Sequence, residues 1–130
     1  GQDDRRLLFL LAVAEKYLNI PMSESDIFLN IVGGIKLKTT ETDLGIISAL
    51  ISSSFKKKIP EDIVIFGEVG LLGEIRPVEV FVEKLECLKK YKFSTIVTDV
   101  ITAQKINIKS EIKIVGIENI FQLKEYILNS

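Results

Sequence analysis

The stretch FGEVGLLGEIRPV, residues 66–78, decides how this chain folds. A short, nearly continuous apolar run at residues 63–66 leads into it and predicts a strand. Glycines then interrupt the stretch at every third position: Gly67, Gly70 and Gly73. Glycines at turn positions between two extended segments are typical of a hairpin. We therefore predict a hairpin-like return that runs through residues 74–78.

The same glycines raise the alternative of a phosphate-binding loop, in which backbone amides at the start of a helix hold an anion. Here the glycines precede another extended segment and not a helix. A second pair, Gly33 and Gly34, lies in GGIK, which lacks the GxxxxGK[ST] spacing. We interpret both sets of glycines as turn residues and predict no nucleotide site.

The rest of the chain alternates between helical and extended patterns. Apolar residues at helical spacing follow Asp3 or Asp4, either of which can cap a first helix that ends near Asn19: Leu7, Leu8, Leu11, Ala14 and Leu18. A second helix is predicted to run to about Phe55, with Asp43, or Thr42 beside it, as its cap. A third helix is predicted after Pro77, and a fourth over residues 120–128. The third helix would turn four apolar side chains inward: Val80, Phe81, Leu85 and Leu88. Further extended segments are predicted at residues 26–32, 35–38, 94–98 and 111–115, with a short helical piece at residues 102–106.

Length and composition fit one domain over residues 1–130. Of the 130 residues, 47% are apolar and 27% charged, which is typical of a chain that buries a core. No run approaches the ~20 apolar residues that span a bilayer, so we expect neither a signal peptide nor a membrane contact. The single cysteine, Cys87, excludes an internal disulfide and favours a reducing cytoplasm.

The chain contains no histidine, which excludes Ser-His-Asp and Cys-His chemistry within it. Histidine is also the commonest metal ligand in proteins, so no metal site is predicted. Three acids near the glycine stretch, Asp43, Glu68 and Glu74, are candidates for an acid–base pair. We interpret them instead as ordinary surface acids and a helix cap.

Basic residues occur in clusters, although the net charge is -1. Besides Arg5 and Arg6, the clusters are Lys36 with Lys38, Lys56, Lys57 and Lys58 together, and Lys89, Lys90 and Lys92, with Arg76 alone. Lys36 and Lys38 share one face of an extended segment, as residues that follow a phosphate backbone do. Solvated faces are the alternative. The tyrosines are dispersed and give no stacking platform for bases.

Two stretches, FLNIVGG at residues 28–34 and the run at residues 66–78, resemble the C-terminal domain of the bacterial RadA/Sms family of DNA repair proteins. The resemblance spans nearly the whole chain. It assigns structural motif positions to Gly33, Gly34, Gly67, Glu68, Gly70, Gly73 and Glu74. It also implies an α+β fold like that of the Lon proteolytic domain, with a mixed sheet packed with helices.

Lon proteases use a Ser–Lys dyad, which needs no histidine because a desolvated lysine can deprotonate a serine. The resemblance places Asp43 at the serine position and Val82 at the lysine position, while Lys84 matches a neighbouring lysine. Peptidase activity is therefore expected to be absent, with no catalytic residue in this chain. A divergent peptidase that uses Ser52, Ser53 or Ser54 with Lys84 is the alternative.

The family resemblance also implies a role and partners. RadA/Sms proteins carry a zinc finger and a RecA-like ATPase, both absent from this chain, and drive branch migration as hexameric rings. The resemblance thus implies ATP, Mg and Zn for the full-length protein and no cofactor here. It implies a scaffold that supports a homo-oligomeric ring and contact with single-stranded or branched DNA. Direct DNA binding through a basic patch is the second hypothesis, with Lys36, Lys38, Lys56, Lys57, Lys58 and Arg76 as candidates.

Overall fold

The computed structural model describes residues 2–21, 40–79, 92–106 and 111–130. Several predictions fall outside these residues and are not tested here. They are the strands at residues 26–32 and 35–38, the helix after Pro77, and the candidate residues Gly33, Gly34, Lys36, Lys38, Val82, Lys84 and Cys87.

The described helices follow the predicted bounds closely. They are α1 (Gln2–Leu18), α3 (Asp43–Phe55), α5 (Val100–Lys105) and α6 (Ile120–Leu128), with a short 3-10 turn η1 (Thr40–Thr42) ahead of α3. Because α1 already begins at Gln2, Asp3 and Asp4 lie inside its first turn and not at its cap. Leu8 is another correction, because it is 54% exposed while Leu10 is fully buried.

Helix ends are set by local chemistry. Asn19 after α1 and Lys56 after α3 both adopt positive φ, at 57° and 52°, which stops the helical path. The Asn119 side chain accepts a hydrogen bond from Gln122 N at 2.9 Å and caps α6. In the same way the Asp99 carboxylate accepts from Thr102 N at 2.8 Å and caps α5.

Five described strands form two sheets. Strands β1 (Ile63–Ile65), β4 (Thr95–Asp99) and β5 (Lys113–Ile117) pair in parallel in the order β1-β4-β5. All five residues of β4 are buried, as expected for the central strand of this sheet. Strands β2 (Glu68–Val69) and β3 (Ile75–Arg76) pair in an antiparallel ladder. The α+β class is therefore confirmed.

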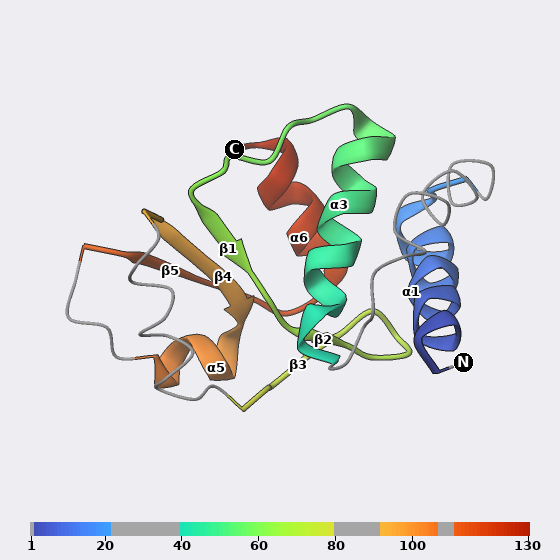
Figure 1. The fold of residues 1–130 in the computed structure, drawn as a ribbon, viewed down its shortest axis with the longest axis horizontal. Coiled ribbons are helices and arrows are strands. Elements are labelled where there is room, and N and C mark those ends of the chain that lie inside the picture. The colour runs from blue at the N-terminus through green and yellow to red at the C-terminus, as the bar shows by residue number, and fades with distance from the viewer. Residues whose placement is uncertain (1, 22–39, 80–91, 107–110) are drawn as a thin grey trace.

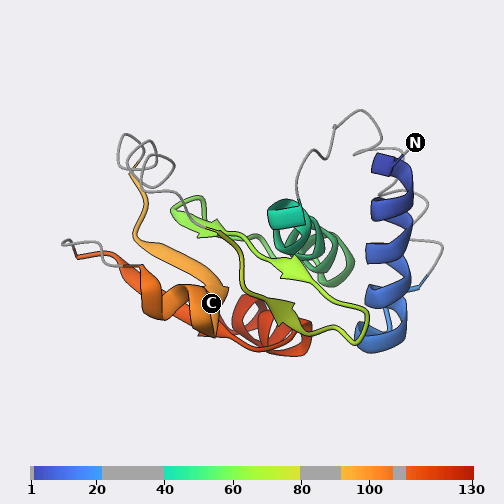
Figure 2. The ribbon, with the colours of Figure 1, turned by 90° about the horizontal axis from the view of Figure 1, so that it is seen from below.

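The helices and the parallel sheet are arranged in layers. Figure 1 shows α3 and α6 on one side of this sheet and α5 on the other side. Figure 2 shows α1 as an outer helix beyond α3 and α6, and α1 contacts both of them. Leu10, Ile47 and Leu123 are each 0% exposed, so the main core lies where α1, α3 and α6 meet.

The predicted hairpin is confirmed at the glycine stretch. Gly73 N donates to Gly70 O at 3.0 Å and Gly70 N donates to Glu74 O at 2.8 Å, which closes a tight turn. Gly73 adopts φ +80°, a value that side chains with a Cβ rarely take. A Cβ on Gly70 would lie 2.1 Å from Glu74 Oε1. Glycine is therefore required at positions 70 and 73 for the tight turn to form.

Leu123→Ala tests the assigned core. The side chain is 0% exposed within the main core, so we expect the free energy of unfolding to fall by about 2–5 kcal/mol in chemical denaturation. The matched control Leu72→Ala removes the same atoms from a side chain that is 69% exposed, and should change stability by about 0.5 kcal/mol or less. Equal losses at the two positions would contradict this core.

Tyr126 on α6 makes the free energy of unfolding depend on pH in the alkaline range. Burial raises the pKa of its phenol, and the nearby Asp62 carboxylate raises it further. The unfolded chain then releases the phenolic proton first, at about pH 10, so stability falls as the pH rises above that value. Tyr126→Phe should flatten this fall in denaturation midpoints measured between about pH 9 and 11. Parallel pH profiles for the variant and the parent chain would contradict the assignment.

Candidate functional site

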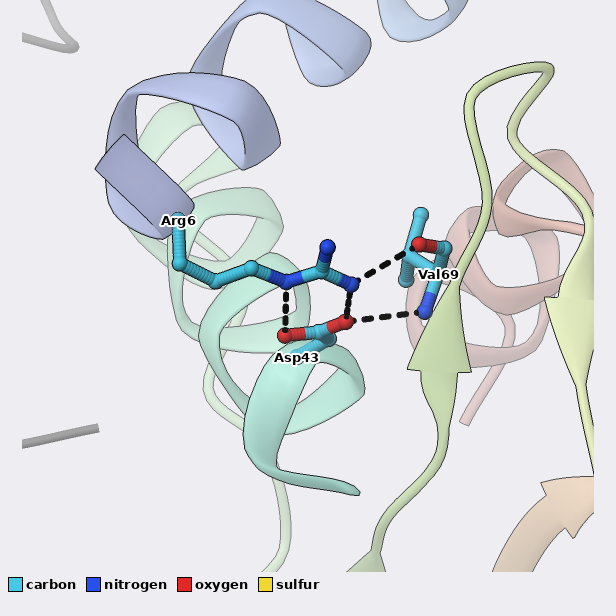
Figure 3. Close-up of polar contacts among 3 residues, drawn as sticks. All are labelled: Arg6, Asp43 and Val69. Carbon is cyan, nitrogen blue, oxygen red and sulfur yellow. Dashed lines mark hydrogen bonds and ion pairs between the residues drawn. The ribbon is translucent and has the colours of Figure 1, made fainter. Parts of the chain in front are cut away.

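Asp43 is the first residue of α3 and its side chain is 1% exposed. The sequence interpretation of Asp43 as a surface acid or a helix cap is therefore wrong. The alternative cap that the sequence offered, Thr42, is confirmed, although its side chain makes no capping hydrogen bond. The Asp43 carboxylate instead points toward Arg6 on α1 and the backbone of Val69 on β2 (Figure 3).

Both carboxylate oxygens of Asp43 have partners. Oδ1 accepts from Arg6 Nε at 3.0 Å, and Oδ2 accepts from Arg6 Nη2 and, at 3.0 Å, from Val69 N. Arg6 Nη2 also donates to Val69 O at 3.0 Å. We call Arg6, Asp43 and Val69 the Asp43 cluster. It joins α1, α3 and the β2–β3 hairpin through one buried carboxylate.

The electrostatics of the cluster favour the charged pair. The hydrogen bond with Asp43 raises the pKa of Arg6, and this effect exceeds the opposing effect of burial. The guanidinium also lies over the Phe9 ring, with Cζ 4.7 Å from the centroid. A bidentate arginine–carboxylate pair with a further backbone donor compensates for the water that the buried carboxylate loses.

The Asp43 side chain differs from a serine nucleophile in two ways. A carboxylate has no hydroxyl to acylate, and each Asp43 oxygen already accepts a hydrogen bond. Glu74 is likewise used by the turn, because its Oε1 accepts from Leu72 N at 3.0 Å. Glu68 lies opposite Arg76 in the β2–β3 ladder. The three candidate acids therefore lie in a buried ion pair, in a strand ladder and in a turn, and they do not form an acid–base pair with one another.

The serines of the alternative peptidase lie toward the other end of α3. Ser52 Oγ donates to Lys57 O at 2.6 Å and so holds the turn after the helix. Ser52 follows Asp43 by nine positions, which is ~13 Å along a helix. These serines therefore do not reach the position that the resemblance assigns to the nucleophile.

The candidate DNA-binding residues that the structure describes fall into two places. Arg76 lies on β3, and the paired strand β2 contacts Asp43, the first residue of α3. The Nη2 atom of Arg76 is 3.6 Å from Glu74 Oε2. The lysines at positions 56–58 follow the last residue of α3. Since α3 has 13 residues, ~20 Å of helix separates the two groups. They do not form one patch.

Three residues that were not predicted as site residues lie near the lysine run: Phe55, Phe121 and Lys124. Lys124 Nζ lies 4.8 Å from the centroid of the Phe55 ring and 6.0 Å from that of Phe121. Both phenylalanines are partly exposed, Phe55 at 38% and Phe121 at 54%. The signal available in the sequence was the position of Phe55 directly before three lysines.

Two other kinds of site are absent from the part of the chain that the structure describes. There, no three His, Cys, Asp or Glu side chains gather as ligands for a metal ion. None of the described helices combines the length and the apolar character needed to cross a membrane.

Comparison with known proteins identifies the class. No family model matches the chain. It is 45% identical over 93 residues to the DNA repair protein RadA of Haemophilus influenzae, 72% of this chain and 20% of that protein. For RadA of Pseudomonas aeruginosa the identity is 41% over 105 residues, 81% of this chain and 23% of that protein. For RadA of Campylobacter jejuni it is 36% over 109 residues, 84% of this chain and 24% of that protein.

The relatives that this α+β domain resembles form one class, since all three are bacterial proteins named for DNA repair. More narrowly, the chain belongs to the RadA family. It spans about a fifth of the length of the curated relatives it matches.

The Asp43 cluster predicts an asymmetry between its two charged members. Arg6→Ala leaves a carboxylate that is 1% exposed without its main partner, and should cost about 3–5 kcal/mol of unfolding free energy. Asp43→Ala should cost less, because the Arg6 side chain is 27% exposed and can turn toward water. The double variant should be less destabilised than the sum of the two single variants.

Chemical denaturation of the three variants measures this coupling. Arg5→Ala is the matched control, because Arg5 is exposed and adjacent, and it should change stability by about 0.5 kcal/mol or less. Additive single losses, or an Arg5→Ala loss equal to that of Arg6→Ala, would show that the ion pair does not hold α1 in place.

Proposed function

We propose that this chain is a non-proteolytic, Lon-like scaffold domain from the C-terminal part of a DNA repair protein. In the longer protein it supports assembly of a hexameric ring and contact with DNA during ATP-dependent branch migration. ATP, Mg and Zn belong to segments outside this chain, and the protein acts in the cytoplasm. The observation that carries the proposal is Asp43, a buried and fully paired carboxylate at the position where the Lon resemblance requires a serine.

The Asp43 cluster supports a scaffold because it uses the would-be nucleophile position for stability. A working Ser–Lys dyad needs a free hydroxyl and space for an acyl group beside it. Here Arg6 and Val69 occupy the hydrogen-bonding positions around the Asp43 side chain. The family membership supports the DNA repair role of the whole protein.

Exposed apolar side chains support the assembly role. Leu71 and Leu72 are 68% and 69% exposed in the turn between β2 and β3. An isolated exposed leucine is ordinary, but two adjacent ones on a turn fixed by glycines form a rigid apolar projection. We assign this turn to the contact between neighbouring copies in the ring.

Leu71→Ser with Leu72→Ser in the longer, ATPase-bearing protein tests this role. We expect the variant to lose hexamers in sedimentation experiments across a wide concentration range, because the contact loses apolar surface. The thermal midpoint of the 130-residue chain with the same two changes should remain unchanged, since both side chains are mostly exposed there. The matched control Ile101→Ser removes a side chain that is 50% exposed on α5, and should keep the hexamer.

Two results would contradict the proposal. Hexamers that persist without the two leucines would remove the turn from the ring contact. Turnover of a fluorogenic peptide that is lost when Ser52, Ser53 and Ser54 are changed to alanine would replace the scaffold with the divergent peptidase.

A further inference from the structure

Lys124 on α6 places its ammonium group over two phenylalanine rings. Phe55 is the last residue of α3, and Phe121 lies in the first turn of α6. The Nζ atom of Lys124 is 4.8 Å from the ring centroid of Phe55 and 6.0 Å from that of Phe121. The face of an aromatic ring attracts a cation, so the two rings hold this charge at a defined place.

The two rings also offer apolar surface to a partner. Phe55 is 38% exposed and Phe121 is 54% exposed. Because one ammonium group contacts both, the two exposed rings lie close together although they come from different helices. A large apolar side chain of a partner protein can therefore pack against both rings at once.

Three more lysines follow Phe55 without a gap. Lys56 and Lys58 are exposed and Lys57 is half-buried. The turn that carries them is fixed, because Lys57 N donates to Ser52 O at 3.0 Å and the Ser52 hydroxyl donates to Lys57 O. The backbone therefore holds the two exposed lysines at a constant place next to the Phe55 ring.

The lysines are available for carboxylates of a partner. Within the described residues, the ion pairs are Arg6–Asp43 and Arg76–Glu74, and neither involves Lys124 or the lysine run. An ion pair formed beside apolar rings is partly shielded from water, which strengthens it relative to a pair in open solvent.

The distribution of charge favours a peptide over a nucleic-acid strand. Exposed carboxylates lie in the same segments as the lysines, at Glu61, Asp62 and Glu125. A nucleic-acid strand carries a phosphate at every residue and would bring some of them toward these carboxylates. A peptide can instead place a few carboxylates opposite individual lysines.

The phenylalanine rings point to the same choice. Bases bind to aromatic side chains by stacking on an open ring face. Here Lys124 already lies over a face of each ring. An apolar side chain has no such requirement, because it gains from contact with any exposed part of the rings.

We propose that Phe55, Lys56, Lys58, Phe121 and Lys124, here called the Phe–Lys surface, bind an acidic peptide segment of a partner protein. The segment carries one large apolar side chain between its carboxylates. The apolar side chain packs on the two rings, and the carboxylates pair with the three lysines. This inference goes beyond the proposed function, since it requires neither ring assembly nor contact with DNA.

Binding of a fluorescent synthetic peptide to the 130-residue chain, measured by anisotropy, tests the proposal. In this peptide aspartates flank one phenylalanine, and both ends are blocked. A peptide with asparagine in place of each aspartate should not bind, because it offers no partner for the lysines. A peptide with serine in place of the phenylalanine should bind about fivefold more weakly, because the rings lose their apolar contact.

Variants of the surface test the role of each part. Phe55→Ala, Phe121→Ala and Lys124→Ala should each weaken binding of the aspartate peptide about fivefold or more. Lys124→Arg keeps a cation over the rings and should retain binding within about twofold.

A charge reversal has a matched control elsewhere on the molecule. Lys58→Glu should weaken binding about tenfold, because it replaces an attraction by a repulsion. Lys105→Glu makes the same change at an exposed lysine that ends α5, on the other side of the parallel sheet (Figure 1), and should keep binding within about twofold. Thermal midpoints check that each variant is folded. Phe121→Ala, at a side chain that is 54% exposed, tests the rings even where Phe55→Ala destabilises the chain.

Three results would overturn the inference. One is unchanged affinity in the variant that carries both Phe55→Ala and Phe121→Ala, and another is equal binding of the asparagine peptide. The third is displacement of the labelled peptide by single-stranded oligothymidylate at a lower concentration than by the unlabelled peptide, which would make the surface a nucleic-acid site. Ring assembly is measured separately by sedimentation of the longer protein, so failure of the Phe–Lys surface leaves the scaffold role standing.

Discussion

The buried carboxylate of Asp43 is the constraint on which the arrangement of α1, α3 and the β2–β3 hairpin depends. A charge with 1% exposure is stable only where hydrogen bonds replace the lost water. Arg6 and Val69 N supply those bonds from two other elements, and the start of α3 adds the positive end of its helix dipole. Any shift of α1 or of the hairpin would leave part of this charge unpaired.

The same position links stability to the absence of peptidase chemistry. Active sites keep polar groups incompletely paired so that they can react, and this usually lowers stability. Under the proposed Lon-like relationship, the nucleophile position has the opposite character, because Asp43 is paired on both oxygens. A substitution that restores a serine there would remove the partner of Arg6 without supplying a base.

Local patterns predicted the elements, whereas contacts between distant elements remained hidden. Apolar periodicity gave the ends of α3 and α6, and the glycine spacing gave the hairpin. The pair Arg6–Asp43 spans 37 positions, and the sequence showed Arg6 only as half of a basic pair. One signal was present: Arg6 precedes Leu10 by four positions and so shares the apolar face of α1. A charge on that face lies close to the interior, where a carboxylate partner stabilises it.

The two ends of α3 differ in burial and in charge. The first end is buried and fixed by the Asp43 cluster, whereas the last end carries Phe55 and exposed lysines. The negative dipole at a helix end amounts to about half a charge, so a run of three lysines exceeds what the end of α3 needs. Because ~20 Å of helix separates the ends, contacts at the lysine run can change without disturbing the buried ion pair. Substitutions in the lysine run should therefore leave unchanged the stability that the Asp43 cluster contributes at the other end of the helix.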